Sequence, residues 1–354
     1  MAADFLPMAL ESPALCDALL ALSSSHISLV DQSYSVVALE AQSNAIKNLT
    51  FSIKSPSDQI TWHESNAATC LAFATSLIST SDSQGWHAHL QGAKHFITSA
   101  AANSRPGGPL KGVDAFKVTP EGRWVLRNFA YHDIIGSIST GRQPLLDPSY
   151  LHDISEVIDS YLGVATGLLI HIGEISSLES EPSLLEYSLV SEIDRSVSFR
   201  EKCLRLENEL ESWRCPIETQ GSLASMAFAY RSAALILLYR LVRRDLPGAI
   251  ENLEEKISSQ VTEALRHISD VPLGHSPEAA LLFPLFIAGG EAREDSQIDL
   301  IRTRLREKAN KRNFQNISRA LKVLESLWNR RRILGIEADW AQILNASGEE
   351  LVLT

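Results

Sequence analysis

An adjacent histidine and aspartate, His132 and Asp133, are the residues of this sequence best suited to chemistry. Such a pair can hold a divalent cation in a metal-dependent phosphohydrolase when another helix supplies a second histidine and aspartate. The candidate helpers are His87, His89 and Asp153. The alternative role for His132 and Asp133 is to satisfy buried polar groups where two helices meet. We expect this structural role and predict no metal site.

A second group of histidines follows Trp86 in the run Trp86-His-Ala-His-Leu-Gln-Gly-Ala-Lys-His95. On a helix His87 and His95 are about two turns apart and share one face, while His89 projects elsewhere. A zinc site is one reading of this pattern. No cysteine or carboxylate completes four ligands at a recognisable spacing, so we predict no zinc here.

Other catalytic signatures fail on spacing. The string Gly136-Ser-Ile-Ser-Thr-Gly141 lacks the G-x-S-x-G order of a serine nucleophile and is expected to end a helix. The glycine pairs at 107–108 and 289–290 lack a phosphate-binding context, and we expect both to form turns. No D-D-x-x-D string occurs, which argues against a terpene synthase. We therefore expect no catalytic residue, no cofactor and no enzyme; an apolar effector cavity among helices stays open.

The four cysteines lie far apart and form no C-x2-C pair, which argues against zinc ribbons and a disulfide framework. We expect all four to be buried thiols. They are Cys16, Cys70, Cys203 and Cys215.

The formal net charge of −11 makes the chain as a whole repel a phosphate backbone, so we expect no sequence-specific DNA binding by this chain itself. Residues 299–332 are the exception, with eleven Lys or Arg against three acidic residues. Such a stretch could bind an acidic partner or DNA. A solvated helix paired with acidic residues elsewhere in the chain explains it equally well and is the interpretation that we favour.

The elements that would position these residues are helices. Apolar residues recur at helical spacing in many windows, and no window shows sustained strand alternation. The clearest windows are 15–26, 38–49 and 314–328. Loop-forming residues separate such windows at 55–58, 103–112, 143–148, 179–182 and 216–222. The sequence predicts an all-α fold, a single irregular bundle of about ten to fourteen helices.

Local signals mark two helix starts. Ser57 or Asp58 could cap a helix through residues 62–77, and Thr119 followed by Pro120 should open one that runs to about Ser139. Asn103–Gly112 is the best linker candidate, but similar helical periodicity resumes on both sides, so we expect one domain over residues 1–354.

Neither a secretory signal nor a membrane span is expected. Asp4 stands where a signal peptide carries positive charge, and Pro7 breaks a short apolar stretch. The run 279–288 is too short to cross a bilayer and contains Pro284. The longer run 223–242 is interrupted by Arg231 and Arg240, so both runs read as core helices.

Four segments in chain order resemble the fungal-specific transcription factor domain, the helical region that follows a binuclear zinc cluster in many fungal regulators. The first is Leu6-Pro-Met-Ala-Leu10 with the Ala/Leu helix from Ser12 to Leu22 and His26. The second is the "W-x-x-H-L-x-G-A" segment, and the third and most specific is "Y-H-D" followed by "G-R-x-P". The fourth is "P-L-F-x-A-G-x-E-A" with the "I-R-x-R-L" helix and a terminal tryptophan helix. The motif positions, which we expect to be structural, are Trp86, His89, Leu90, Gly92, Ala93, Tyr131, His132, Asp133, Gly141, Arg142, Gly289, Glu291, Ala292 and Trp328.

This resemblance implies a nuclear regulator of RNA polymerase II transcription that senses an effector. The expected partners are other transcription regulators, a second copy of the chain, or a small molecule, and not a membrane. The family's six-cysteine zinc cluster is absent from this sequence. The chain thus looks like a stand-alone regulatory domain, a truncated gene product or a fragment, and zinc is expected only if an upstream cluster exists. The alternative is a helical small-molecule-binding protein or enzyme that reuses the scaffold.

Overall fold

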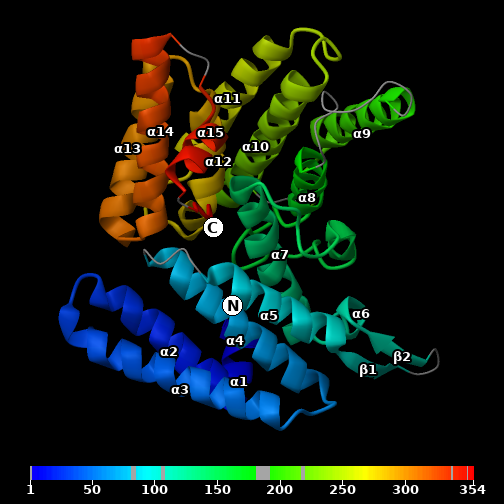
Figure 1. The fold of residues 1–354 in the computed structure, drawn as a ribbon, viewed down its shortest axis with the longest axis vertical. Coiled ribbons are helices and arrows are strands. Elements are labelled where there is room, and N and C mark those ends of the chain that lie inside the picture. Colours follow the sequence, from blue (N-terminus) through cyan, green and yellow to red (C-terminus); the bar gives the residue numbers. More distant parts are fainter. Residues whose placement is uncertain are drawn as a thin grey trace. The chain divides into compact units, whose positions relative to one another are not determined.

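The computed structural model confirms the all-α fold and shows fifteen α-helices and two short strands in the part of the chain that it describes (Figure 1). That part comprises residues 2–80, 85–104, 108–180, 192–216, 220–335, 338–348 and 350–354. The chain divides into two compact units. Unit 1 comprises residues 1–133 and 309–316, and unit 2 comprises residues 134–308 and 317–354. The expectation of a single domain stays a prediction.

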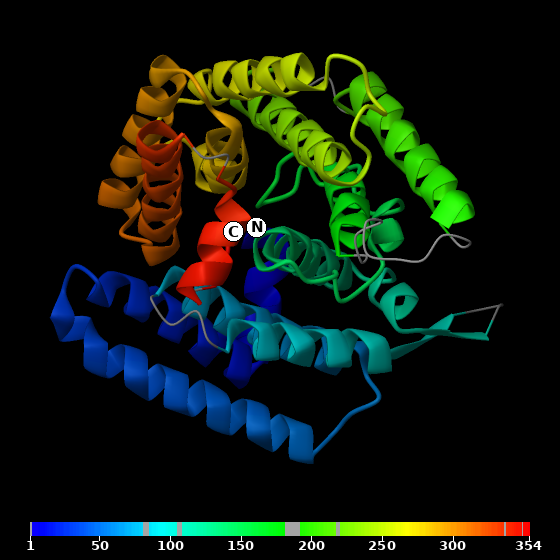
Figure 2. The same cartoon turned by 45° about the horizontal axis from the view of Figure 1, so that its top comes forward.

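Unit 1 is built on two antiparallel helix pairs, α2 with α3 and α4 with α5, and α2 also packs on α4. In Figures 1 and 2, α3 lies on the side of α2 that faces away from α4. Alanines at 18 and 45, with Phe73 of α4, make one of its cores. Its elements are α1 (Ala2–Glu11), α2 (Pro13–Ser28), η1 (Gln32–Tyr34), α3 (Ser35–Lys54), α4 (Ile60–Ser79), α5 (Trp86–Ser99), β1 (Ala101–Ser104), β2 (Gly108–Lys111), α6 (Val113–Phe116) and the part of α7 (Pro120–Thr140) up to Asp133.

Unit 2 is organised around α10, which packs against α8, α9, α11 and α12. The end of α7 belongs to this unit, and the turn between α13 and α14 belongs to unit 1. Its remaining elements are η2 (Pro148–Leu151), α8 (Leu168–Glu179), α9 (Glu192–Ser212), α10 (Ser222–Asp245), α11 (Leu253–Ser269), η4 (Ser276–Leu281), α12 (Leu282–Glu291), α13 (Asp295–Arg312), α14 (Gln315–Leu334) and α15 (Trp340–Ser347).

Side-chain caps explain where several helices begin. The Ser12 hydroxyl accepts from the Leu15 amide ahead of Pro13, which opens α2. Thr119 accepts from the Gly122 amide at the start of α7, as the sequence predicts. The helix predicted through residues 62–77 is α4, but its predicted cap was wrong. Gln59 is the N-cap without a side-chain hydrogen bond, and Ser57 accepts from the Gln59 amide just before the helix begins.

The predicted linker at 103–112 contains a strand pairing that sequence periodicity did not indicate. β1 and β2 pair antiparallel, with Ala101 opposite Lys111 and Ser104 opposite Gly108. Strands of four residues are too short to show alternation, so they escape a periodicity search. Gly107 lies outside the described residues, and Gly108, the first residue of β2, has φ +92°.

One described helix, α10, is long and apolar enough to cross a membrane by length and composition. Its most apolar window is 72% buried inside the protein, and Tyr230 and Tyr239 on it are fully buried. Burial of this kind is what a core helix shows. The length and composition of α10 are therefore weak evidence for a membrane span.

The expectation of four buried thiols is wrong for Cys16, which is exposed on α2, and for Cys215, which is half-buried. Cys70 and Cys203 are buried, and burial raises the pKa of each thiol to about 12. All four are free thiols.

Candidate functional site

The Trp-His-Leu-Gly-Ala motif forms the inner face of α5, where that helix packs on α4. Trp86, Leu90 and Ala93 are buried. Gly92 lets the helices approach closely, because a Cβ at this position would lie 3.2 Å from the Cys70 sulfur of α4. His89 packs its ring on Phe73 of α4, with 5.1 Å between ring centroids. These contacts describe a helix-packing motif.

His132 and Asp133 lie buried on the part of α7 that belongs to unit 1. His132 Nε2 is 3.1 Å from the Thr75 hydroxyl of α4, and Tyr131 lies beside its ring. Burial lowers the pKa of His132 to about 4, so the imidazole is neutral at pH 7. A neutral, hydrogen-bonded imidazole between two helices fits the structural role.

The proposed helpers of a metal site come from other elements: His87 and His89 are on α5, and Asp153 belongs to unit 2. Among the residues that the structure describes, no group of three or more His, Cys, Asp or Glu side chains is placed to hold a metal ion.

The Gly141-Arg142 motif marks the end of α7, as predicted for the Gly-Ser-Ile-Ser-Thr-Gly string. Gly141 has φ +65°, a left-handed conformation that glycine adopts without strain. Arg142 then forms an ion pair with Glu350 near the C-terminus. Ser176 of α8 donates to the Arg142 carbonyl, which fixes the chain as it leaves the helix.

The prediction of a turn at Gly289-Gly290 is wrong, because both glycines are in the interior of α12. A Cβ at Gly289 would lie 2.7 Å from the tip of Leu324, and a Cβ at Gly290 would lie 2.7 Å from the Trp340 ring. The two glycines therefore let α14 and α15 pack close to the α12 backbone. Trp328 of α14 donates its indole N–H to the Gly289 carbonyl at 2.9 Å.

Glu291, the last residue of α12, is the centre of a buried ion network. Its carboxylate accepts from Arg240 at 2.6 Å and from Arg243 at 2.9 Å and 3.0 Å, both on α10. Arg240 also binds both carboxylate oxygens of Asp339 and lies 5.0 Å from the Trp340 ring centroid. Only 2% of the Glu291 side chain and 8% of the Arg240 side chain are exposed, so each charge depends on its partners.

The protonation of Glu291 reflects this network. Burial by itself would raise the pKa of the carboxyl, but the charges of Arg240, Arg243 and Arg331, with a hydrogen bond from Arg243, hold the pKa below its ordinary value. The carboxylate is thus charged at neutral pH. The desolvated arginines on α10 fix the end of α12.

A pocket of about 510 Å³ opens next to this network, between the start of α13 and the last turns of α14. Two motif residues, Ala292 and Trp328, belong to its lining, and Arg302 lies 5.4 Å from the Trp328 ring centroid. The charged residues that line it are Arg293, Arg302, Arg331, Arg332, Asp295 and Asp299. Cations outnumber carboxylates, so the pocket suits an anionic group. We call it the arginine pocket.

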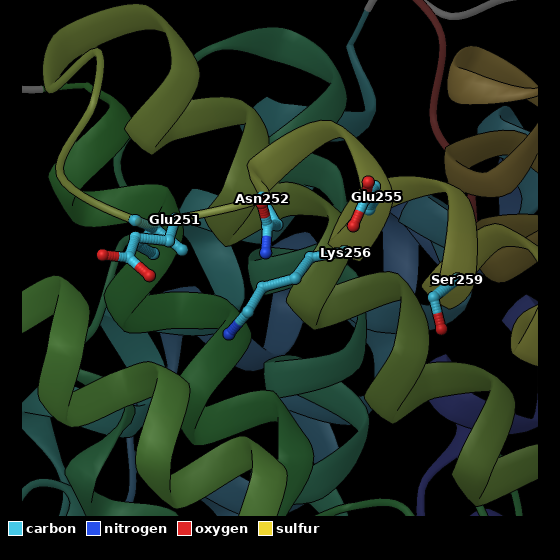
Figure 3. A pocket seen from close by; sticks show the side chains of 6 residues that line it. Glu251, Asn252, Glu255, Lys256 and Ser259 are labelled. Carbon is cyan, nitrogen blue, oxygen red and sulfur yellow. The ribbon is translucent and has the colours of Figure 1, made fainter.

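A pocket of about 550 Å³ lies at the start of α11. Figure 3 shows its side chains diverging, with Lys256 directed away from Glu255 and Ser259. Lys256 binds Glu207 of α9 at 2.6 Å and lies near the Tyr239 ring, so its charge is neutralised within the protein. Because these groups do not converge, this pocket is the weaker candidate.

A pocket of about 700 Å³ in unit 1 is lined mainly by α1, α3, α4 and the loop before α4, with many hydroxyl groups. Glu64 borders it, and burial raises the pKa of Glu64 although Thr119 donates a hydrogen bond to it. Residues of the first family-like segment, such as Pro7 and Ser12, line this pocket, but none of the fourteen motif positions does. The arginine pocket is therefore the candidate site.

Sequence reasoning missed several residues of this region: Arg240, Arg243, Asp339, Trp340 and Arg331. One signal was present in Arg240, which interrupts a long apolar run. A charge on the buried face of a core helix needs a counter-ion. The partner Asp339 is 99 residues away and cannot be found from spacing.

The basic segment 299–332 forms most of α13 and α14. Many of its cations have partners within unit 2, which supports the interpretation of charges paired within the chain. Lys308 is buried against Glu278 at 3.2 Å, and Arg306 pairs with Glu325 at 2.9 Å. Arg304 donates to the carbonyls of Ser269 and Val271.

Comparison with known proteins agrees with the four motifs. A family model described as the fungal specific transcription factor domain matches residues 2–354. No curated protein and no solved structure matches the chain. With nearly every residue inside the match, the chain belongs to the fungal-specific transcription factor domain family.

Proposed function

We propose that this chain is the effector-sensing regulatory domain of a nuclear regulator of RNA polymerase II transcription. Family membership supports a role in transcription regulation. The sensing role rests on one observation: Arg331 lines the arginine pocket and also donates to the carbonyl of Ala338, the residue before Asp339 of the ion network. A ligand that engages Arg331 would change the electrostatic surroundings of the ion pair that holds α12 to α10.

The ligand that fits this site is a small organic anion, such as a carboxylate or a phosphate ester with an apolar part. The arginines suit the anionic group, and Trp328 and Ile298 offer apolar surface. Binding regulates only if the anion has different affinities for two arrangements of the helices. Displacement of Arg331 from the Ala338 carbonyl is the difference that we propose.

Binding can be tested with inorganic phosphate, citrate and benzoate as probes, by calorimetry and by the shift of melting temperature of the whole chain. We expect one of the organic anions to bind saturably and Arg332→Ala to weaken that binding at least about fivefold. Arg330→Ala is the matched control, because Arg330 is exposed on α14 but does not line the pocket. If both variants lost the same affinity, or if no anion bound saturably, the proposal that the arginine pocket binds an anion would be refuted.

The role in transcription needs a separate test. The chain is fused to an unrelated DNA-binding module, and a reporter is measured in fungal cells with a fluorescent tag to follow nuclear location. We expect the reporter to respond to the anion and the Arg332→Ala fusion to lose the response. Anion binding without any effect on the reporter would favour the alternative of a small-molecule-binding protein that reuses the scaffold.

We propose that DNA contact comes from a partner or from a separate zinc-cluster module. The net charge of −11 supports this, since a chain so acidic repels phosphate. In an electrophoretic mobility assay at moderate salt, the chain alone should give no sequence-specific shift of duplex DNA. A specific shift would show that the cations at 299–332 bind DNA.

A further inference from the structure

The outer face of α3 carries an unusual amount of exposed apolar surface. Alanines at 38, 41 and 45 form the buried face, where α3 packs on α2. The opposite face is apolar as well, although a solvent-facing helix surface is ordinarily polar. The exposed large side chains on that face are Val36 (63% exposed), Leu39 (66%), Ile46 (48%) and Ile53 (52%), while Val37 (40%) and Phe51 (72%) are exposed outside it.

The spacing of this face is that of a coiled-coil seam. Positions 36, 39, 43, 46, 50 and 53 alternate steps of three and four residues, and all six side chains are exposed. Four of them are Val, Leu or Ile, and the other two are Ser43 and Thr50. A regular a/d pattern facing solvent indicates a second helix as its partner.

The charges beside the seam point to which helix that is. Glu40 and Lys47 flank it on the same side, both exposed and seven residues apart. When two copies of α3 lie antiparallel about a two-fold axis, Leu39 faces Thr50 and Ser43 faces Ile46 of the second copy. In this register Glu40 of each copy lies beside Lys47 of the other. The face is thus complementary to itself in shape and charge.

We propose that this face of α3 is the interface of a homodimer in which two copies of α3 pack antiparallel. A parallel arrangement would place Gln42, not Glu40, beside Lys47 and would form no opposite-charge pair. The antiparallel register gives two such pairs and meets the closed two-fold symmetry of most dimers. The dimer brings two regulatory domains together independently of any effector.

The test is the mass of the whole chain by sedimentation or light scattering over about 1–200 µM, the range in which a modest helix interface dissociates. We expect wild type to dimerise in this range. Leu39→Glu should raise the dimer dissociation constant at least about tenfold, because it places a charge in the seam. The matched control is Val197→Glu on α9, a helical position that is 50% exposed, and it should leave the constant unchanged.

Charge reversal separates this register from other self-association. Glu40→Lys and Lys47→Glu should each weaken the dimer, and the double variant should restore it, since the pairs reform with opposite sign. A wild type that stays monomeric at about 200 µM would overturn the proposal and leave the face for a different protein. The proposal would also be overturned if Leu39→Glu left the dimer dissociation constant unchanged, or if the double variant dimerised no more tightly than the single variants.

Discussion

The surroundings of His132 in unit 1 and of Glu291 in unit 2 bury titratable side chains in opposite ways. In unit 1, burial shifts the pKa values of His63, Glu64 and His132 toward their neutral forms, the histidines down and the glutamate up. In unit 2, Arg240 and Glu291 keep their charges, because partners more than offset the desolvation of each. Removing the partner of a buried neutral group lowers stability less than removing the partner of a buried ion, because the ion is then left without a counter-charge.

The largest expected effect comes from breaking the ion network of unit 2. Glu291→Ala leaves Arg240 and Arg243 without their buried counter-charge and should lower the stability of unit 2 by about 3–5 kcal/mol. Hydrogen exchange of α10 and α12 amides in the whole chain reports this locally. Glu254→Ala is the control: this partner of Arg243 is 69% exposed, and its loss should cost no more than about 1 kcal/mol. If Glu291→Ala and Glu254→Ala lowered stability equally, the buried Glu291 network would contribute no more than an exposed ion pair.

The next effect concerns the neutral His132 of unit 1. Its folded pKa of about 4 lies below the unfolded value of about 6.5, so the unfolded chain binds the extra proton between these pH values. Stability is present above pH 6.5 and is lost as the pH falls toward 4, by up to about 3 kcal/mol. Exchange of α4 and α7 amides should therefore accelerate on acidification.

His132→Ala should reduce that acid dependence, leaving the part due to His63, and should lower the melting temperature at pH 7, since Thr75 loses its contact and a cavity forms. The loss should be about 2 kcal/mol. His95→Ala, at an exposed histidine, is the control and should change neither. Metal content of the purified protein should be negligible. Stoichiometric metal that disappears in His132→Ala would contradict the structural role.

Helical glycines allow a smaller comparison between the units. Gly290→Ala should destabilise unit 2 by about 1–2 kcal/mol, because its Cβ would meet the Trp340 ring at 2.7 Å and a buried ring cannot move aside easily. In unit 1, Gly92→Ala meets the Cys70 sulfur at 3.2 Å, and the helix propensity of alanine offsets this mild crowding. Thermal unfolding of both variants measures the contrast. A costly Gly92→Ala would mean that the α4–α5 contact is the tighter one.

The smallest expected effect is an increase in stability. Burial raises the pKa of Glu64, so its contribution to stability is present at low pH and is lost as the pH rises through the folded pKa. Glu64→Gln removes this cost and still accepts from Thr119, so stability at pH 7 should rise by less than about 1 kcal/mol. The gain should vanish near pH 4. A loss at pH 7 would show that Glu64 is charged and paired.

Much of the fold could be predicted from the sequence, because helix formation is encoded locally. Thr119 and Pro120 specify the start of α7, and Gly141 specifies its end. Four-residue strands and the missing cap of α4 could not be predicted, since short elements carry little periodic signal. At the candidate site, Ala292 and Trp328 were found through their motifs, whereas Arg302, Arg331 and Arg332 were noted only as part of the basic segment 299–332.

The sequence by itself determined the helical class, the family and the start of α7, since each depends on residues a few positions apart. Tertiary structure alone decided the use of Gly289 and Gly290, which approach Leu324 and Trp340 instead of forming a turn. It also decided which charges meet: Arg240 binds Glu291, 51 residues away, and Asp339, 99 residues away. Such partners are chosen by packing, because only the folded core brings them together and removes the water that would otherwise solvate them.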